Sequence, residues 1–215
     1  MKKNILIKNS LSLIKFNRSN IFLVIPTTTV KPTIVGDPHV RVGIPNEPAI
    51  CFDVTDKDQS ILSLIKDVET GLEVNGQVFT EDFKKEKSRL ERIGIVSPHG
   101  VQIGIYTDEI TIGTNDLITE RYSYEENVSK GMSDVHFVIR KLEKGTPKRG
   151  ITVAIGSNSE IRFNVFIKRH KDSMIFEIER SGGSSQNLAG ILGQTMRGQT
   201  KYHVYENGEI EVNER

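Results

Sequence analysis

The chain has 215 residues, of which 36% are hydrophobic and 27% charged, a balance that supports one large or two small packed domains and argues against disorder throughout. The 29 Lys and Arg residues nearly balance the 28 Asp and Glu residues, so the net charge of +1 gives no general attraction for nucleic acid or for an anionic membrane. A single cysteine, Cys51, excludes an intrachain disulfide framework, and 7% aromatic residues without tryptophan disfavour a base-stacking surface.

Residues 1–35 differ in composition from the rest of the chain and are predicted to be a poorly ordered leader and linker. Short apolar runs alternate there with Lys, Asn and Ser, and the Thr/Pro-rich stretch Thr27–Thr33 is typical of an extended linker. A short helix over Leu6–Phe16 is the element expected within this leader.

The N-terminal segment does not match a secretion signal or a membrane anchor. The first three residues have the charge of a signal-peptide start, but Lys8, Lys15 and Arg18 interrupt the apolar core that should follow. The apolar run Ile21–Ile25 is too short to cross a membrane, so no membrane insertion is predicted. We therefore expect either a cytoplasmic protein or a chain whose natural start lies upstream of the first residue.

The sequence Gly36-Asp37-Pro38-His39 follows the leader directly. An Asp-Pro bond is unusually labile in acid, because the Asp carboxylate can attack its own main-chain carbonyl and the proline nitrogen, a tertiary amide, departs readily once protonated. Glycine before the pair allows a tight bend, and histidine after it can carry a proton near neutral pH. The motif alone therefore favours an ordinary turn, with a site of cleavage or acyl transfer between Asp37 and Pro38 as the alternative.

From Val40 onward, short runs rich in β-branched residues are separated by turn signals roughly every 8–12 residues, which is the spacing of an all-β sandwich or barrel. The predicted strands are Ile50–Val54, Ile61–Ile65, Ile93–Val96, Val101–Tyr106, Glu109–Ile112, Val135–Leu142, Ile151–Ile155, Ile161–Ile167, Met174–Ile178, Tyr202–Tyr205 and Glu209–Val212.

Three turn sequences and two helical interruptions complete the prediction. Asn-Gly pairs at 75–76 and 207–208 predict hairpins, and residues 97–100, Ser-Pro-His-Gly, predict a tight turn. Helical structure is expected over Glu81–Arg92 and in a turn near Leu188–Leu192. The predicted fold is mainly β: a single antiparallel β-sandwich or barrel-like domain over residues 36–215, with one or two short helices.

No catalytic, metal or cofactor site is predicted. The five histidines lack the i, i+4 partners or cysteine neighbours of zinc sites, and the Asp53, Asp56 and Asp58 turn lacks the spacing of a calcium loop. The nucleophile-elbow pattern G-x-S-x-G is absent. We therefore expect no enzyme activity apart from self-processing at Asp37-Pro38.

One basic cluster is a candidate for contact with a sulfated polysaccharide, with a solvated surface as the alternative. It consists of Lys168, Arg169, His170 and Lys171.

Two sequons, at Asn17 and Asn127, match the glycosylation acceptor pattern and weakly support a secreted context.

Several segments, taken in order, resemble the C-terminal domain of inter-alpha-trypsin inhibitor heavy chains, and the resemblance covers residues 36 to about 212. The longest segment, over Ile61–Gln77, is the most distinctive. The segments are Gly36–His39, Ala49–Val54, Ile61–Gln77, Arg92–Val96, Thr107–Ile112 and Leu188–Gln194.

The resemblance implies a protein that acts outside the cell and has no nucleic-acid partner. Heavy chains of this family are secreted and cut at the Asp-Pro bond. The new C-terminal Asp is esterified to the chondroitin sulfate of a Kunitz inhibitor and then transferred to hyaluronan, which stabilises the matrix. On this chain, Asp37 would form the ester, Pro38 would be the leaving amine and His39 would protonate it. The domain after Pro38 would be removed, and the protein would belong to a serine protease inhibitor complex.

The chain departs from the family pattern in three places. The long domains that precede the Asp-Pro site in the family do not fit in 35 residues, Val40 replaces an aromatic residue, and Leu188-Ala189-Gly190 stands where the family tends to have His-Gly. We therefore expect a partial heavy chain. The alternative is a stand-alone extracellular β module for adhesion or glycosaminoglycan binding. The motif also resembles the start of von Willebrand factor type D modules, although one cysteine is too few for that class.

Overall fold

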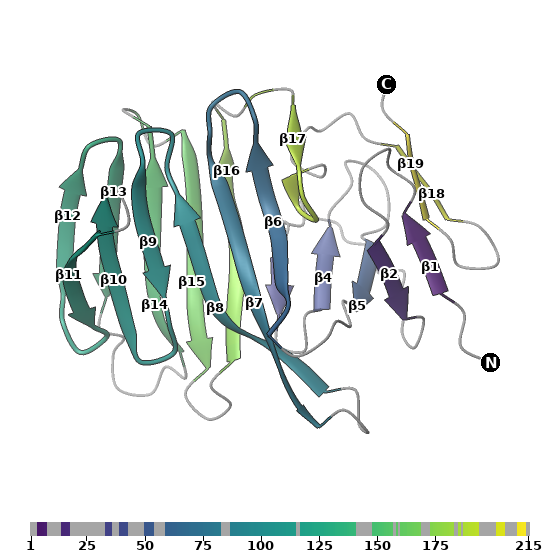
Figure 1. Cartoon of the computed structure of the whole chain (residues 1–215), viewed down its shortest axis with the longest axis horizontal. Helices are drawn as coiled ribbons and strands as arrows, with labels where there is room; N and C mark the ends of the chain where they lie inside the picture. The colour runs from purple at the N-terminus through teal and green to yellow at the C-terminus, as the bar shows by residue number, and fades with distance from the viewer. Residues whose placement is uncertain are drawn as a thin grey trace.

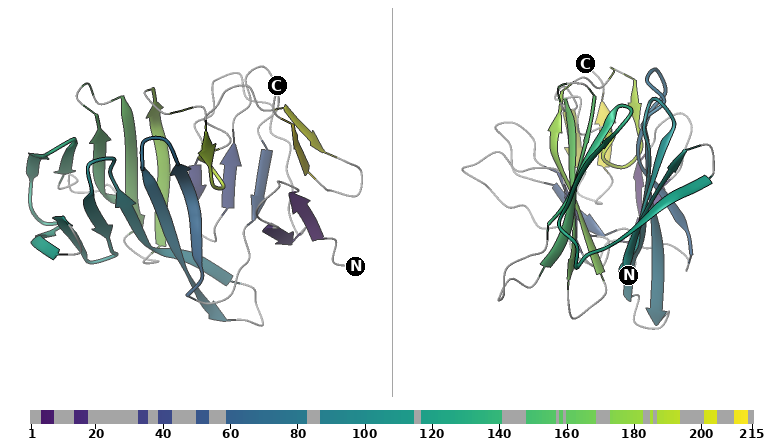
Figure 2. Two further views of the ribbon diagram at one scale, coloured as in Figure 1. Left: turned by 45° about the horizontal axis from the view of Figure 1, so that its top comes forward. Right: turned by 90° about the vertical axis from the view of Figure 1, so that its left-hand side faces the viewer.

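A computed structural model of the chain describes residues 4–7, 14–17, 33–35, 39–42, 50–53, 59–82, 87–114, 117–140, 148–156, 158, 160–168, 173–182, 185, 187–193, 201–204 and 210–213. Two antiparallel sheets face each other as a sandwich, which confirms the mainly β prediction (Figures 1 and 2). No helix in these ranges is long and apolar enough to span a membrane.

The first sheet has seven strands in the order β11-β10-β9-β8-β7-β6-β17. Six of them follow one another in sequence, so each pairs with its neighbour through a short connection. The bounds are β6 Ile61–Asp67, β7 Glu73–Asp82, β8 Lys87–Val96, β9 Val101–Ile105, β10 Glu109–Thr114, β11 Leu117–Ser123 and β17 Leu188–Ala189.

The second sheet has eight strands in the order β12-β13-β14-β15-β16-β3-β4-β5. Strands β12 to β16 follow one another in sequence. Strands β3 to β5, from the N-terminal part of the chain, continue the sheet beyond β16. The bounds are β12 Val128–Met132, β13 Val135–Arg140, β14 Lys148–Ile155, β15 Ile161–Lys168, β16 Ser173–Ser181, β3 Thr33–Val35, β4 His39–Val42 and β5 Ile50–Asp53.

Two further hairpins lie outside these sheets. Asn4–Ile7 (β1) pairs with Ile14–Asn17 (β2), and Lys201–Val204 (β18) pairs with Ile210–Asn213 (β19). The strand pair β18–β19 is the one predicted around the Asn-Gly pair at 207–208, which itself lies outside the described residues.

The core lies between the two large sheets and follows the two-residue period of the strands. On β15, for example, every second residue from Ile161 to Ile167 is buried while the residues between them are partly exposed. Phe163 and Phe176 contact each other with ring centroids 5.3 Å apart, and Tyr122 packs on Phe137 across the sandwich at 5.5 Å. Each fully buried side chain of this size contributes about 1.5–3 kcal/mol to folding.

The hairpin predicted at Asn75-Gly76 is wrong, because both residues lie inside β7. The chain turns earlier, between Asp67 and Leu72, where Gly71 adopts a φ of 82°. Gly76 has a packing role instead: a Cβ there would lie 2.9 Å from Leu90 Cδ2 and 3.2 Å from Leu64 Cδ1. The tight turn at 97–100 is confirmed, with Gly100 N donating to Ser97 O at 2.9 Å.

Both predicted helices are also wrong where the structure describes them. Glu81 and Asp82 end β7, and Lys87 begins β8. Ser88, Leu90 and Ile93 of β8 are buried, and the residues between them are partly or fully exposed. The segment Leu6–Phe16 contributes to β1 and β2.

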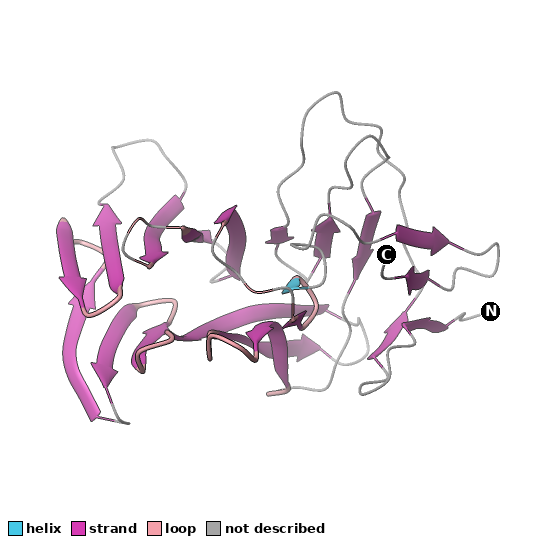
Figure 3. Ribbon diagram, turned by 90° about the horizontal axis from the view of Figure 1, so that it is seen from above, coloured by secondary structure: helices cyan, strands magenta, loops and turns pink. Residues whose placement is uncertain are grey.

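The turn near Leu188–Leu192 is confirmed by Gly190, which has a φ of 90°, and by the bond from Leu192 N to Leu64 O. Gly193 alone among the described residues is helical (Figure 3).

The expected division into a leader of residues 1–35 and a domain of residues 36–215 stays a prediction. The last three residues of that leader, Thr33–Val35, nevertheless form β3 in the eight-stranded sheet.

Candidate functional site

The Asp-Pro sequence joins two neighbouring strands of the eight-stranded sheet. Asp37 and Pro38 lie outside the described residues, but β3 ends at Val35 and β4 begins at His39. The two strands are antiparallel, with Val35 opposite His39 and Ile34 opposite Val40. The link of residues 36–38 is therefore bounded on both sides by a fixed pair of strand residues.

β3 is an inner strand, held from both sides. Its other neighbour is β16, with Phe176 opposite Ile34 and Ile175 opposite Val35. Ile34, Val40 and Phe176 are fully buried and occupy one row across three strands. The segment before the Asp-Pro bond is thus anchored in the core of the sandwich, not only joined to it through the backbone.

His39 occupies an outer-face position of β4, since the next residue, Val40, is buried. It is partly buried, and the register sets it opposite Val35 on one side and opposite Asp53, at the end of β5, on the other. Residues directly opposite on antiparallel strands have Cβ atoms about 4.5–5.5 Å apart. Sequence reasoning considered Asp53 only as a calcium ligand, because nothing in the sequence gives the β4–β5 register.

The remaining predicted site residues are spread over the molecule. Lys168 ends β15, while Arg169 to Lys171 lie outside the described residues. Asn17 ends β2, and Asn127 is exposed just before β12, as a glycosylation acceptor would need to be. In the described part of the chain, no group of three or more His, Cys, Asp or Glu residues could hold a metal ion.

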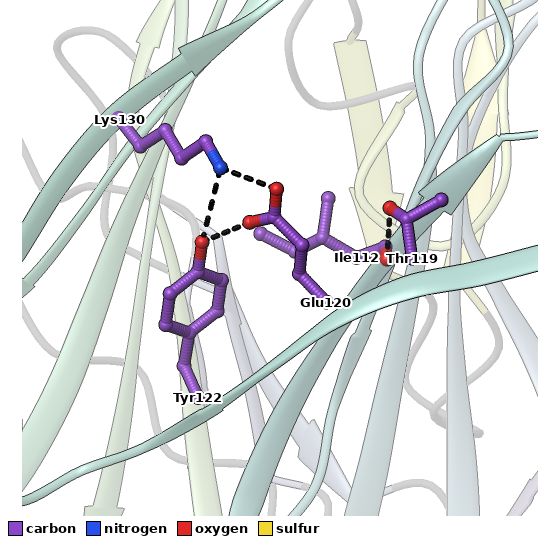
Figure 4. A network of polar contacts seen from close by, with 5 residues as sticks. All are labelled: Ile112, Thr119, Glu120, Tyr122 and Lys130. Atoms are coloured by element: carbon purple, nitrogen blue, oxygen red, sulfur yellow. Dashed lines mark hydrogen bonds and ion pairs between the residues drawn. The ribbon is translucent and has the colours of Figure 1, made fainter.

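A polar network joins the two edge strands at the opposite end of the sandwich (Figure 4). Lys130 on β12 forms an ion pair with Glu120 on β11, and the Tyr122 hydroxyl donates to the same carboxylate. The hydrogen bond from Lys130 lowers the pKa of Glu120, and the bond to Glu120 raises the pKa values of Lys130 and Tyr122. Because all three groups are engaged with one another, the network connects the two sheets and offers no free acid or base.

A second network of hydrogen bonds centres on Asp67, within the stretch Ile61–Gln77. The Asp67 side chain is buried and accepts hydrogen bonds from Ser185 N at 2.8 Å and Ser185 Oγ at 2.6 Å, and from the amides of Glu69 and Thr70. Burial raises the pKa of this carboxyl, but the bonds from Ser185 and Thr70 outweigh that effect and hold the pKa below its usual value. Asp67 thus shapes the β6–β7 turn and anchors residue 185 to it.

The described geometry defines a two-sheet antiparallel sandwich whose Asp-Pro link joins two inner strands. No family model matches the chain. Curated proteins to which it is similar include inter-alpha-trypsin inhibitor heavy chains, which confirms the resemblance seen in the sequence. It is 28% identical over 173 residues to heavy chain H3 of Bos taurus, 28% over 189 residues to heavy chain H2 of Mus musculus and 26% over 169 residues to heavy chain H1 of Sus scrofa.

The three alignments cover 74%, 80% and 74% of this chain but only 18%, 19% and 18% of the relatives. The chain therefore spans less than a fifth of the length of the heavy chains it matches, which is consistent with the expected partial, C-terminal region.

Proposed function

We propose that this chain is the C-terminal region of a secreted, heavy-chain-like protein that is cut between Asp37 and Pro38, leaving Asp37 to form an ester with a glycosaminoglycan. Through that ester the protein takes part in hyaluronan metabolism and matrix stabilisation, within a serine protease inhibitor complex carrying a chondroitin sulfate chain. The role is not that of an enzyme acting on other molecules. The similarity to heavy chains supports the family context.

The observation that carries the proposal is the strand register around the link. Val35 and His39 are paired, so only residues 36–38 separate two ends that the sheet fixes side by side. Holding reacting groups in place can supply an effective molarity of about 10⁵ M or more. The pairing of the two strand ends limits how far residues 36–38 can spread, and this supports the proposed attack within the Asp-Pro unit.

The proposed chemistry has two steps. An Asp37 carboxylate oxygen attacks the main-chain carbonyl carbon of the same residue, the bond to the Pro38 nitrogen breaks, and His39 gives that nitrogen a proton. The cyclic anhydride is then opened by a sugar hydroxyl, which forms the ester while its proton passes to the basic histidine. Water in place of the sugar would complete simple cleavage.

Mass spectrometry of the protein secreted from cells tests the cleavage. We expect a product that begins at Pro38, its loss in Asp37→Asn, and a rate reduced by about 10²-fold or more in His39→Ala. The chain contains its own control in Ser97-Pro98-His99, where serine replaces the carboxylate and no cut is expected. An intact secreted chain, or equal cleavage in Asp37→Asn, would reject the proposal in favour of an uncut β module.

A further inference from the structure

We propose that the place of β3 in the eight-stranded sheet is an exchange site: once the link of residues 36–38 is cut, the site releases its own β3 and accepts the β3 of a second copy of this chain. The inference rests on the proposed function in one respect, since a cut between Asp37 and Pro38 is what removes the covalent tether of β3. The exchange itself needs only a cut somewhere in the link, and it is therefore testable without self-processing.

β3 is a short strand that separates two others. Ile34 is opposite Phe176 of β16 on one side and opposite Val40 of β4 on the other. In the strand order of the sheet, β4 and β16 are not neighbours. Without β3 they would stand two strand spacings apart, which is about 10 Å, and each would present an unpaired backbone edge to the gap. The gap therefore fits one extended strand.

One buried side chain determines which strand the gap accepts. Ile34 is fully buried and belongs to the same core cluster as Val40 and Phe176, which are also fully buried. Thr33, the residue before it, is only partly buried, as expected where successive side chains point to opposite faces. A strand that enters the gap must therefore bring a large aliphatic side chain at its middle position. A charged group there would be buried without a partner, which is costly.

A second copy of this chain supplies a strand that meets these requirements. Its β3 has the same Ile34 in the same register, so the exchanged state keeps the backbone pairing and the core contacts of the original one. Exchange of an identical element between copies is for that reason a low-cost route to association. The pairings among β12 to β16 do not involve β3, so a strand of only three residues, Thr33–Val35, can leave without disrupting them.

In the uncut chain, the link of residues 36–38 opposes exchange. A short tether keeps β3 beside the gap at an effective concentration on the order of millimolar, well above what a second copy reaches in dilute solution. Cutting the link makes the original β3 and the β3 of the second copy equal competitors for the gap. The cut thereby converts a fixed strand of the sheet into an exchangeable one, and the segment that ends at Asp37 can pass from one copy to another.

Exchange is tested with the full chain, in which a specific protease site is placed in the link and the cut is made on the folded protein. Equal amounts of unlabelled and isotope-labelled cut chains are mixed, and native mass spectrometry follows the noncovalent pairs. We expect hybrids, in which the labelled segment before the cut is bound to the unlabelled part after it, to approach the statistical proportion of free exchange. Uncut chains mixed in the same way should give no mixed-isotope assembly.

A peptide with the sequence of residues 30–37 isolates the role of β3 and leaves the protein unchanged. Fluorescently labelled and added in excess, it should bind the cut chain and not the uncut chain, as measured by anisotropy. Within the peptide, Ile34→Asp should abolish binding, Ile34→Ala should weaken it by about 30-fold or more, and Ile34→Val should keep it within about tenfold. The control peptide carries Lys31→Gln, a change before β3, and should bind like the parent.

The outcomes separate the exchange site from the processing. Absence of hybrids from cut chains, or binding of the Ile34→Asp peptide as tightly as the parent peptide, would overturn the inference. Hybrids that form after the protease cut, in a chain that yields no Pro38 product in cells, would reject only the proposed processing. A Pro38 product whose two parts never exchange between copies would reject only the exchange site.

Discussion

At the scale of single residues, Asp67 shows how one buried carboxylate holds the β6–β7 turn in place. Its carboxylate is buried and satisfied by Ser185 and by the amides of its own turn, so the charged form is the one the fold stabilises. The folded-state pKa is lowered, and the stabilisation is therefore present above the unfolded pKa of about 3.9 and lost as the pH falls through the folded value.

Asp67→Asn is expected to lower the free energy of unfolding at pH 7 by about 1–3 kcal/mol, because the amide cannot accept the same set of bonds. Chemical denaturation at pH 7 and at steps below pH 4 measures the effect. The difference from wild type should shrink on acidification as the wild-type carboxylate becomes protonated. A difference that is the same at every pH would show that charge is not the reason for the stabilisation.

Gly76 is the residue where sequence and structure disagree most informatively. Asn-Gly is typical of a hairpin turn, but here the missing Cβ makes room for Leu64 and Leu90. We expect Gly76→Ala to destabilise the fold by about 1–3 kcal/mol through overpacking. Gly94→Ala on β8 is the control, because nothing lies within 4 Å of its added Cβ. Equal midpoints for the two variants in urea unfolding would contradict this packing role.

At the scale of elements, the sequence predicts what depends on local pattern. Strands such as Ile161–Lys168 and Glu109–Thr114 follow from alternation and β-branched content, and the turn at 97–100 follows from its Pro and Gly. The sequence predicts a helix over part of Lys87–Val96, because its many charged residues leave no clear alternation of apolar and polar positions. Its identity as a strand depends on pairing with both β7 and β9, which only the tertiary structure provides.

In the candidate site, too, the sequence predicts the local motif but not the residues that lie next to it in the fold. The Asp-Pro-His sequence is visible in the chain, but its place between two inner strands depends on β3 joining β16, more than 130 residues away. The position of Asp53 opposite His39 is likewise a product of register. Cross-strand neighbours of this kind carry no signal in a single sequence, because the residues involved are separated by turns of variable length.

At the scale of the whole molecule, the position of β3 changes what cleavage would do. A cut between Asp37 and Pro38 opens one connection inside the eight-stranded sheet and leaves β3 hydrogen-bonded to β4 and β16. Ile34 remains in the core, where truncating a buried side chain of this kind to alanine costs about 2–5 kcal/mol. Cleavage and separation of the two parts are therefore distinct steps, and the second requires β3 to leave the sheet.

We expect a chain cut in the 36–38 link to remain a single species until β3 is released. A specific protease site placed in the link allows the cut to be made on the folded protein, and size-exclusion chromatography then follows the two fragments. They should elute together in native buffer and apart in denaturant, and Ile34→Ala should speed their separation because it weakens the anchor of β3. The exposed-site variant Ile61→Ala serves as the control, since that side chain is 72% exposed and lies on the other sheet. Immediate separation of the wild-type fragments in native buffer would show that β3 does not hold them together, and a carboxyl end at Asp37 would then be free for transfer as soon as it formed.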